Sequence, residues 1–91
     1  MTKAELIGKI AESTGFDHAT VSVVVEEFMS KTRESVASGN TLYLRGFGSF
    51  GPKLRRATIG RNITEGTTVP IPARKIPFFK PSPAFSRLMQ K

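Results

Sequence analysis

The chain has 91 residues, which is enough for one small domain that buries only about 60–65% of its unfolded surface. It contains no cysteine, which excludes a disulfide scaffold, a thiolate nucleophile and cysteine-ligated zinc or iron–sulfur sites. Fourteen lysines and arginines against seven acidic residues give a formal net charge of +7. With neither disulfide nor metal to support a small core, oligomerisation is the expected source of stability.

A first helix is predicted at the N-terminus. Thr2 followed by Glu5 has the spacing of a capping box, in which two free amide groups at a helix start find acceptors. Gly15 is expected to end the helix. Its apolar positions follow the helical period: Leu6, Ile7, Ile10 and Ala11.

A second, longer helix is predicted over roughly 18–38, with Asp17 as its N-cap and Gly39-Asn40 as its stop. Three consecutive valines at 23–25 would also suit a strand, but the length of the periodic stretch favours a helix. Its apolar positions form one stripe at helical spacing: Val21, Val24, Val25, Phe28, Met29, Thr32 and Val36. The two helices form a helical hairpin.

The period then changes to two. Residues 41–44 alternate as a strand, and the glycines of 45–50 turn the chain into a second strand. Pro52 cannot donate to a ladder and therefore marks a sheet edge or a bulge. Residues 53–59 are extended and cationic, and 60–68 are rich in turn residues.

A third strand is predicted over 69–80, where prolines at 70, 72 and 77 favour an edge or a paired ribbon. Ser82 then caps a short last helix that begins at Pro83 and runs through Met89. The predicted order is two helices, three strands and one helix. Residues from about 53 to 76 are too polar to bury and are interpreted as a projecting two-stranded ribbon.

The charge is concentrated in the second half. Residues 1–40 carry four cations and six anions, a net charge of −2, whereas 41–91 carry ten cations and one anion, a net charge of +9. So many cations repel one another unless a polyanion compensates them, and nucleic acid is the commonest such partner. A merely solubilising basic surface would not need this clustering.

Four segments together resemble the bacterial HU/IHF family of histone-like DNA-bending proteins. They are Gly-Phe-Gly-Ser-Phe at 46–50, Gly-Arg-Asn-Ile-Thr-Glu-Gly at 60–66, Ile-Pro-Ala at 71–73 and Ile-Pro-Phe-Phe-Lys at 76–80. The similarity runs in register through the whole chain. It implies an α+β fold: a helical hairpin base, a three-stranded antiparallel sheet with an extended β-ribbon arm, a short C-terminal helix, and two such chains intertwined as a dimer.

The resemblance further implies one HU/IHF-like domain over 1–91. Residues 1–40 would form the helical dimerisation half and about 53–76 the DNA-binding arm, while Phe47, Phe50 and Phe79 would lie in the dimer core. The expected function is non-catalytic: minor-groove binding and bending of double-stranded DNA for nucleoid compaction. The alternative is a sequence-specific bending factor of the IHF type. Homodimer and heterodimer with a paralogue both stay open.

The expected DNA-binding residues follow from the resemblance and from strand periodicity. Arg61 and Asn62 would contact the minor groove, and Ile63 would wedge between base pairs where the family commonly has proline. One of Arg74 and Lys75 should face DNA, since neighbours in a strand alternate, and by resemblance both are candidates. The remaining candidates for phosphate contacts are Lys3, Gly46, Lys53, Arg55, Arg56 and Lys80.

Two other classes of function compete with DNA bending. An enzyme is disfavoured because His18 is the only histidine and no phosphate-binding glycine loop is present. A cationic interaction module for RNA, an acidic protein or a lipid surface stays open. No apolar run approaches the roughly 18 residues of a membrane span, and no signal-peptide pattern is present. The expectation is a cytoplasmic, nucleoid-associated protein with no membrane, metal, cofactor or small-molecule substrate.

Overall fold

The structure is a computed structural model that describes residues 1–62 and 67–90, and for 58–62, 67–69 and 71 it describes the backbone alone. The chain divides into two compact units, Met1–Glu34 and Ser35–Lys91. The charge divides at the same boundary, because all the acidic residues except Glu65 belong to the first unit. The helical unit is therefore weakly acidic, and the strand-rich unit is strongly basic.

The helices begin and end where capping chemistry predicts. In α1 (Lys3–Thr14), the Thr2 hydroxyl accepts a hydrogen bond from the Glu5 amide at 3.2 Å, and Gly15 forms the C-cap. In α2 (His18–Ala37), an Asp17 carboxylate oxygen accepts from the Thr20 amide at 3.3 Å. Both predicted N-caps are confirmed, and the valine run lies in a helix.

The first unit has a thin core. Ile7 and Val21 are its buried apolar side chains, at 3% and 4% exposure. On α2, Val23 and Val24 are 63% and 61% exposed, and Phe28 is 45% exposed. An apolar helix face of this kind is normally covered by another surface.

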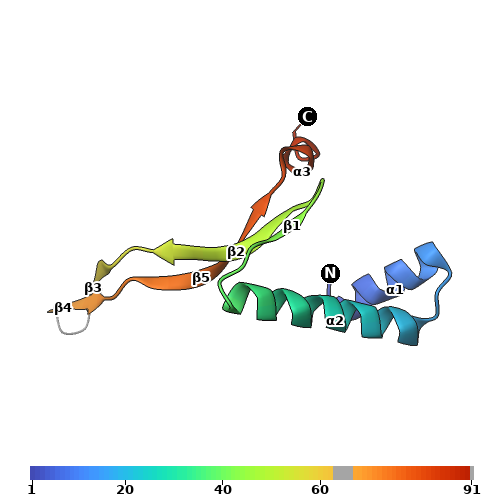
Figure 1. Ribbon diagram of the computed structural model, residues 1–91, viewed down its shortest axis with the longest axis horizontal. Coiled ribbons are helices and arrows are strands. Elements are labelled where there is room, and N and C mark those ends of the chain that lie inside the picture. The colour runs from blue at the N-terminus through green and yellow to red at the C-terminus, as the bar shows by residue number, and fades with distance from the viewer. Residues whose placement is uncertain (63–66, 91) are drawn as a thin grey trace. The chain divides into compact units, whose positions relative to one another are not determined.

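The second unit contains a three-stranded antiparallel sheet in the order β1-β2-β5, as predicted (Figure 1). Its strands are β1 (Leu42–Leu44), β2 (Gly48–Arg55) and β5 (Arg74–Pro81). β1 pairs only with the start of β2, so the strand edge at Pro52 has no partner on that side. The edge position predicted for this proline is confirmed.

The predicted third strand is wrong as one continuous element. It is divided into β4 (Thr67–Ile71) and β5, and β4 pairs with β3 (Thr58–Asn62) in a separate two-stranded sheet. The turn-rich interpretation of 60–68 was too wide, because 60–62 and 67–68 lie in these strands. Backbone pairing across the ribbon holds these residues in strands, although their local composition favours turns.

The two sheets share one register. Arg55 lies opposite Arg74 at the end of the first ladder, and Thr58 lies opposite Ile71 at the start of the second. Residues 56–57 and 72–73 therefore interrupt both strands at the same level and by the same length. The ribbon continues through this interruption without a register slip.

A phenylalanine cluster forms the centre of the second unit. Phe50 and Phe79, opposite each other on β2 and β5, have ring centroids 4.7 Å apart. Phe47 lies 5.2 Å from Phe79 and stacks on Phe85 of α3 (Pro83–Arg87) at 5.4 Å. α3 begins as predicted, since the Ser82 hydroxyl accepts from the Phe85 amide at 3.1 Å, but it ends before Met89. Phe47 is still 41% exposed.

Candidate nucleic-acid interface

The register of the β2–β5 ladder separates its side chains onto two faces. Residues directly opposite each other in an antiparallel pair point to the same side, and alternate residues share a side. The basic face, as we call it, carries four cations, Lys53, Arg55, Arg74 and Lys80, together with Tyr43, Ser49, Ile76 and Phe78. The apolar face carries Leu42, Leu44, Phe50 and Phe79.

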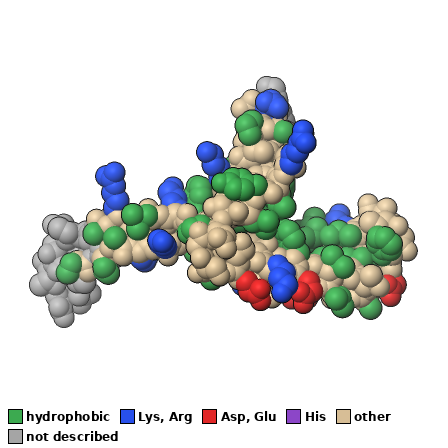
Figure 2. All heavy atoms as spheres, in the orientation of Figure 1, with side chains coloured by type: hydrophobic (Ala, Val, Ile, Leu, Met, Phe, Trp, Pro, Cys, Tyr) green, Lys and Arg blue, Asp and Glu red, His purple; other side chains and the backbone are tan. Residues whose placement is uncertain are grey.

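The basic face has no acidic neighbour among the described residues of its unit, because Glu65 is the only acidic residue after Glu34. Figure 2 shows Lys and Arg side chains along the strands, whereas the Asp and Glu side chains visible in this view lie over the helices. Arg55 and Arg74 are directly opposite each other and both exposed. Two guanidinium groups placed opposite each other repel, and an anion bound between them would reduce this repulsion.

One hollow on this unit is lined by both cations and apolar side chains. Lys53, Arg55, Arg56, Ile76 and Phe78 are among the residues that surround a volume of about 350 Å³. The Lys53 ammonium lies 4.2 Å from the centroid of the Phe78 ring, within the range of a cation–π contact. In this hollow the Phe78 ring therefore contacts the Lys53 ammonium, and Arg55 and Arg56 lie beside it.

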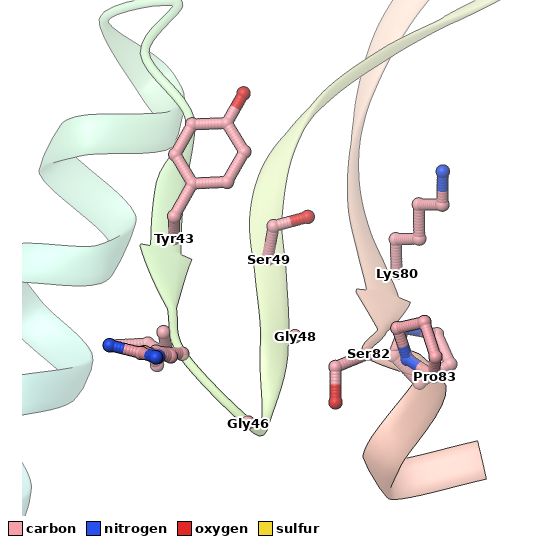
Figure 3. A pocket seen from close by; sticks show the side chains of 10 residues that line it. Tyr43, Gly46, Gly48, Ser49, Lys80, Ser82 and Pro83 are labelled. Atoms are coloured by element: carbon pink, nitrogen blue, oxygen red, sulfur yellow. The ribbon is translucent and has the colours of Figure 1, made fainter. Parts of the chain in front are cut away.

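A second hollow, of about 260 Å³, lies where the β1–β2 turn meets the start of α3 (Figure 3). Tyr43, Ser49 and Lys80 line it from the three strands, and Ser82 and Pro83 line it from the start of the helix. Arg45 and Gly46 complete the wall at the turn. Hydroxyl donors and cations around an open hollow suit an anion such as a phosphate.

The two glycines of the turn have different roles. Gly46 has a φ of 80°, and a β-carbon placed there would meet nothing within 4 Å. At Gly48 a β-carbon would lie 2.5 Å from the Lys80 carbonyl oxygen and 2.7 Å from the Phe79 ring. Gly48 therefore allows β5 to pack closely, and Gly46 leaves open space beside the backbone.

The comparisons with known proteins agree with this geometry. The family described as "Bacterial DNA-binding protein" matches residues 1–90. The chain belongs to this family, the HU/IHF proteins. The resemblance seen in the sequence is thus confirmed, and the family is one of architectural DNA-binding proteins.

Three relatives give the degree of similarity. Integration host factor subunit alpha of Actinobacillus pleuropneumoniae is 38% identical over 81 residues, which cover 89% of this chain and 83% of the relative. DNA-binding protein HU of Thermus thermophilus is 33% identical over 91 residues, 100% of this chain and 94% of the relative. The Anabaena HU–DNA cocrystal structure has a TM-score of 0.93 at 31% identity and covers 99% of this chain and 98% of that one.

Within this HU/IHF chain, the structure brings some predicted site residues together and not others. Arg74 shares the basic face, whereas Lys75 lies on the other side, opposite Leu54. Arg56 is exposed just beyond β2. Lys3 opens α1, where its ammonium pairs with the Glu26 carboxylate on α2, and both side chains are about half exposed, at 53% and 48%. A surface pair of this kind contributes little stability.

The predicted arm-tip residues are described only in part. Arg61 and Asn62 lie in β3, where their backbones pair opposite Thr68 and Thr67. Ile63, the predicted wedge, lies outside the described residues. Among the residues that the structure describes, no three His, Asp or Glu side chains gather as a metal site would require, and no helix is long and apolar enough to cross a membrane.

Sequence reasoning missed two aromatic members of the basic face. Tyr43 is 79% exposed and lies between two leucines that point to the other face. The alternation of residues 42–44 in the sequence already indicates that its side chain points away from those of the leucines. Phe78 is 42% exposed beside the clustered Phe79. Its side of the strand follows from alternation with Phe79, whereas its position beside Lys53 depends on the pairing register of β2 with β5.

Proposed function

We propose that this HU/IHF protein binds the minor groove of double-stranded DNA as a dimer and bends the duplex. The observation that carries the proposal is the basic face, which presents Lys53, Arg55, Arg74 and Lys80 on one side of a ladder with no acidic neighbour in its described unit. Side chains spaced along a ribbon suit the regular spacing of phosphates. Contacts of this kind position a protein without reading sequence.

A dimer of two copies is supported by the thin core. Val23, Val24 and Phe28 leave an apolar face on α2, and Phe47 is partly exposed in the aromatic cluster. Burying these side chains against a second copy would supply stability that a chain of 91 residues lacks. Residues 1–40 would then serve dimerisation, and about 53–76 would form the DNA-binding arm of each subunit.

The proposed bending step takes place at the arm tip. Ile63 would insert between base pairs with Arg61 and Asn62 beside it in the minor groove, which costs a few kcal/mol of lost stacking. The bend would bring flanking DNA to Lys3 and Lys80, and Gly46 would let the backbone approach a phosphate. Counterion release at these phosphates would offset the cost of bending.

The test is a fluorescence-transfer bend assay on a nicked duplex across a salt series, with the dimer verified by analytical ultracentrifugation. If about six to ten phosphates are neutralised, affinity falls by roughly 10³–10⁵ between 50 and 200 mM salt. Ile63→Asp should lose bending and keep the dimer. A monomer, a straight duplex at low salt, or a nearly flat salt response would each contradict the proposal.

A sequence-specific bending factor of the IHF type is a second candidate, since an integration host factor subunit, at 38% identity, and an HU protein, at 39%, are similar to this chain to the same degree. Both candidates need the same clamp, but specificity would arise from the deformability of particular base steps. Competition between random intact duplexes and nicked duplexes separates them. A general nucleoid protein prefers the nicked DNA whatever its sequence, whereas a specific factor selects a subset of intact duplexes.

A further inference from the structure

We propose that Phe78 is a positioning residue that holds Lys53 ready for a DNA phosphate. The inference rests on the proposed function, since it assigns a role in DNA binding to a side chain outside the predicted site. It stands on two observations: the 4.2 Å separation between the Lys53 ammonium and the Phe78 ring centroid, and the presence of both residues on the basic face.

The ladder explains why the ring can reach this lysine. Phe78 lies directly opposite Gly51, which offers no side chain to pack against, and Lys53 lies opposite Ile76, the next position on that face. Phe78 and Lys53 are therefore diagonal neighbours across the two strands. Aromatic and long side chains can touch at this separation.

Packing does not require an aromatic side chain at this position. The phenylalanine cluster is on the other face, where Phe79 lies 4.7 Å from Phe50, and Phe78 is left 42% exposed among cations. Within the part of the chain that the structure describes, Lys53 forms no ion pair, and it stands two residues from Arg55. The electron-rich face of the ring attracts the Lys53 ammonium, whereas the neighbouring Arg55 repels it.

An ammonium on a ring keeps donors for a phosphate. Lysine carries three N–H donors, and a ring on one side leaves the outward donors available. A long side chain normally loses rotamer freedom when it is fixed at an interface, and the ring imposes part of that restriction before DNA arrives. Lys53 should then bind with a smaller loss of entropy beside Arg55 and Arg56, with which it lines the 350 Å³ hollow.

The test is a double-mutant cycle of Phe78→Leu and Lys53→Met, with affinity for a nicked duplex measured at one fixed salt concentration. Leucine keeps an apolar side chain but removes the ring. We expect Phe78→Leu to weaken binding by roughly two- to five-fold per arm. Phe78→Tyr and Phe78→Trp, which keep a ring face, should restore the wild-type affinity. In the Lys53→Met background, Phe78→Leu should have no further effect.

Two controls keep the result specific. Lys9→Met removes the same charge from an exposed position on α1 that the proposed interface does not include, and it should change affinity less than Lys53→Met does. Thermal unfolding of each variant at one protein concentration shows whether the fold is intact. Should Phe78→Leu unfold the chain, Phe78→Met, whose flexible apolar side chain also lacks a ring, takes its place in the cycle.

The outcomes separate this inference from the proposed function. If Phe78→Leu costs the same affinity with and without Lys53, or costs none, Phe78 does not act through Lys53 and the inference is overturned. If Lys53→Met leaves affinity unchanged while the wild type still bends DNA, the inference again falls and the proposed function stands. If the wild type leaves the duplex straight, the proposed function itself fails.

Discussion

Replacing Gly48 by alanine should disrupt the junction between β2 and β5. The new β-carbon would lie 2.5 Å from the Lys80 carbonyl oxygen, which belongs to the backbone of the paired strand and cannot rotate away. Two Phe79 ring atoms would lie 2.7 Å from it. Overpacking typically costs about 1–3 kcal/mol. Because a rigid backbone atom is involved, and because alanine must also adopt the φ of 157° at this position, we expect a loss of about 3 kcal/mol.

Gly46 supplies the matched control in the same turn. An alanine there has open space, so the cost is limited to its φ of 80°, about 1–2 kcal/mol. Urea unfolding at one fixed protein concentration measures both variants. Equal losses, or a smaller loss at Gly48 than at Gly46, would refute the packing argument. Duplex affinity measured on the folded Gly46→Ala variant also tests whether Gly46 is a phosphate contact.

Three further predictions address the dimer, the salt response and α3. Val24→Glu on the exposed α2 face should convert the proposed dimer to a monomer or an unfolded chain, as seen by analytical ultracentrifugation. Arg55→Gln should lower the slope of log affinity against log salt by about one per arm, whereas Lys9→Gln should leave the slope unchanged. Ser82→Ala removes the hydroxyl that accepts from the Phe85 amide, and it should cost about 1 kcal/mol in urea unfolding; no measurable change would mean that the cap does not contribute.

The sequence predicted what depends on local chemistry. Thr2, Asp17 and Ser82 were identified as N-caps, and each side chain accepts the expected amide hydrogen bond. Capping is decided within four residues, so a single sequence contains all that is needed. The family resemblance was equally accessible, because glycines and prolines at fixed spacing carry it.

The prediction failed where distant pairing decides the structure. Residues 60–62 have the composition of a turn, yet they pair opposite 67–69 as a strand. The third strand is interrupted at 72–73, level with the interruption of the facing strand at 56–57. The choice between Arg74 and Lys75 likewise depends on the register, which places Arg74 opposite Arg55 and Lys75 opposite Leu54. None of these facts is contained in a short window of sequence.

Register is therefore the property on which the basic face depends, and a pair of prolines helps to fix it. Pro52 lies opposite Pro77, and neither has an N–H to donate. Such a pair fits only at a non-hydrogen-bonded position of the ladder, where the backbone N–H and C=O groups of the two opposite residues point away from each other. A slip of one residue would bring a proline to a donor position and leave a carbonyl unpaired, and it would also turn Lys53 and Arg55 toward the side of the phenylalanine cluster. The prolines, which in the sequence indicated a sheet edge or a paired ribbon, thus act against a register slip that would break up the basic face.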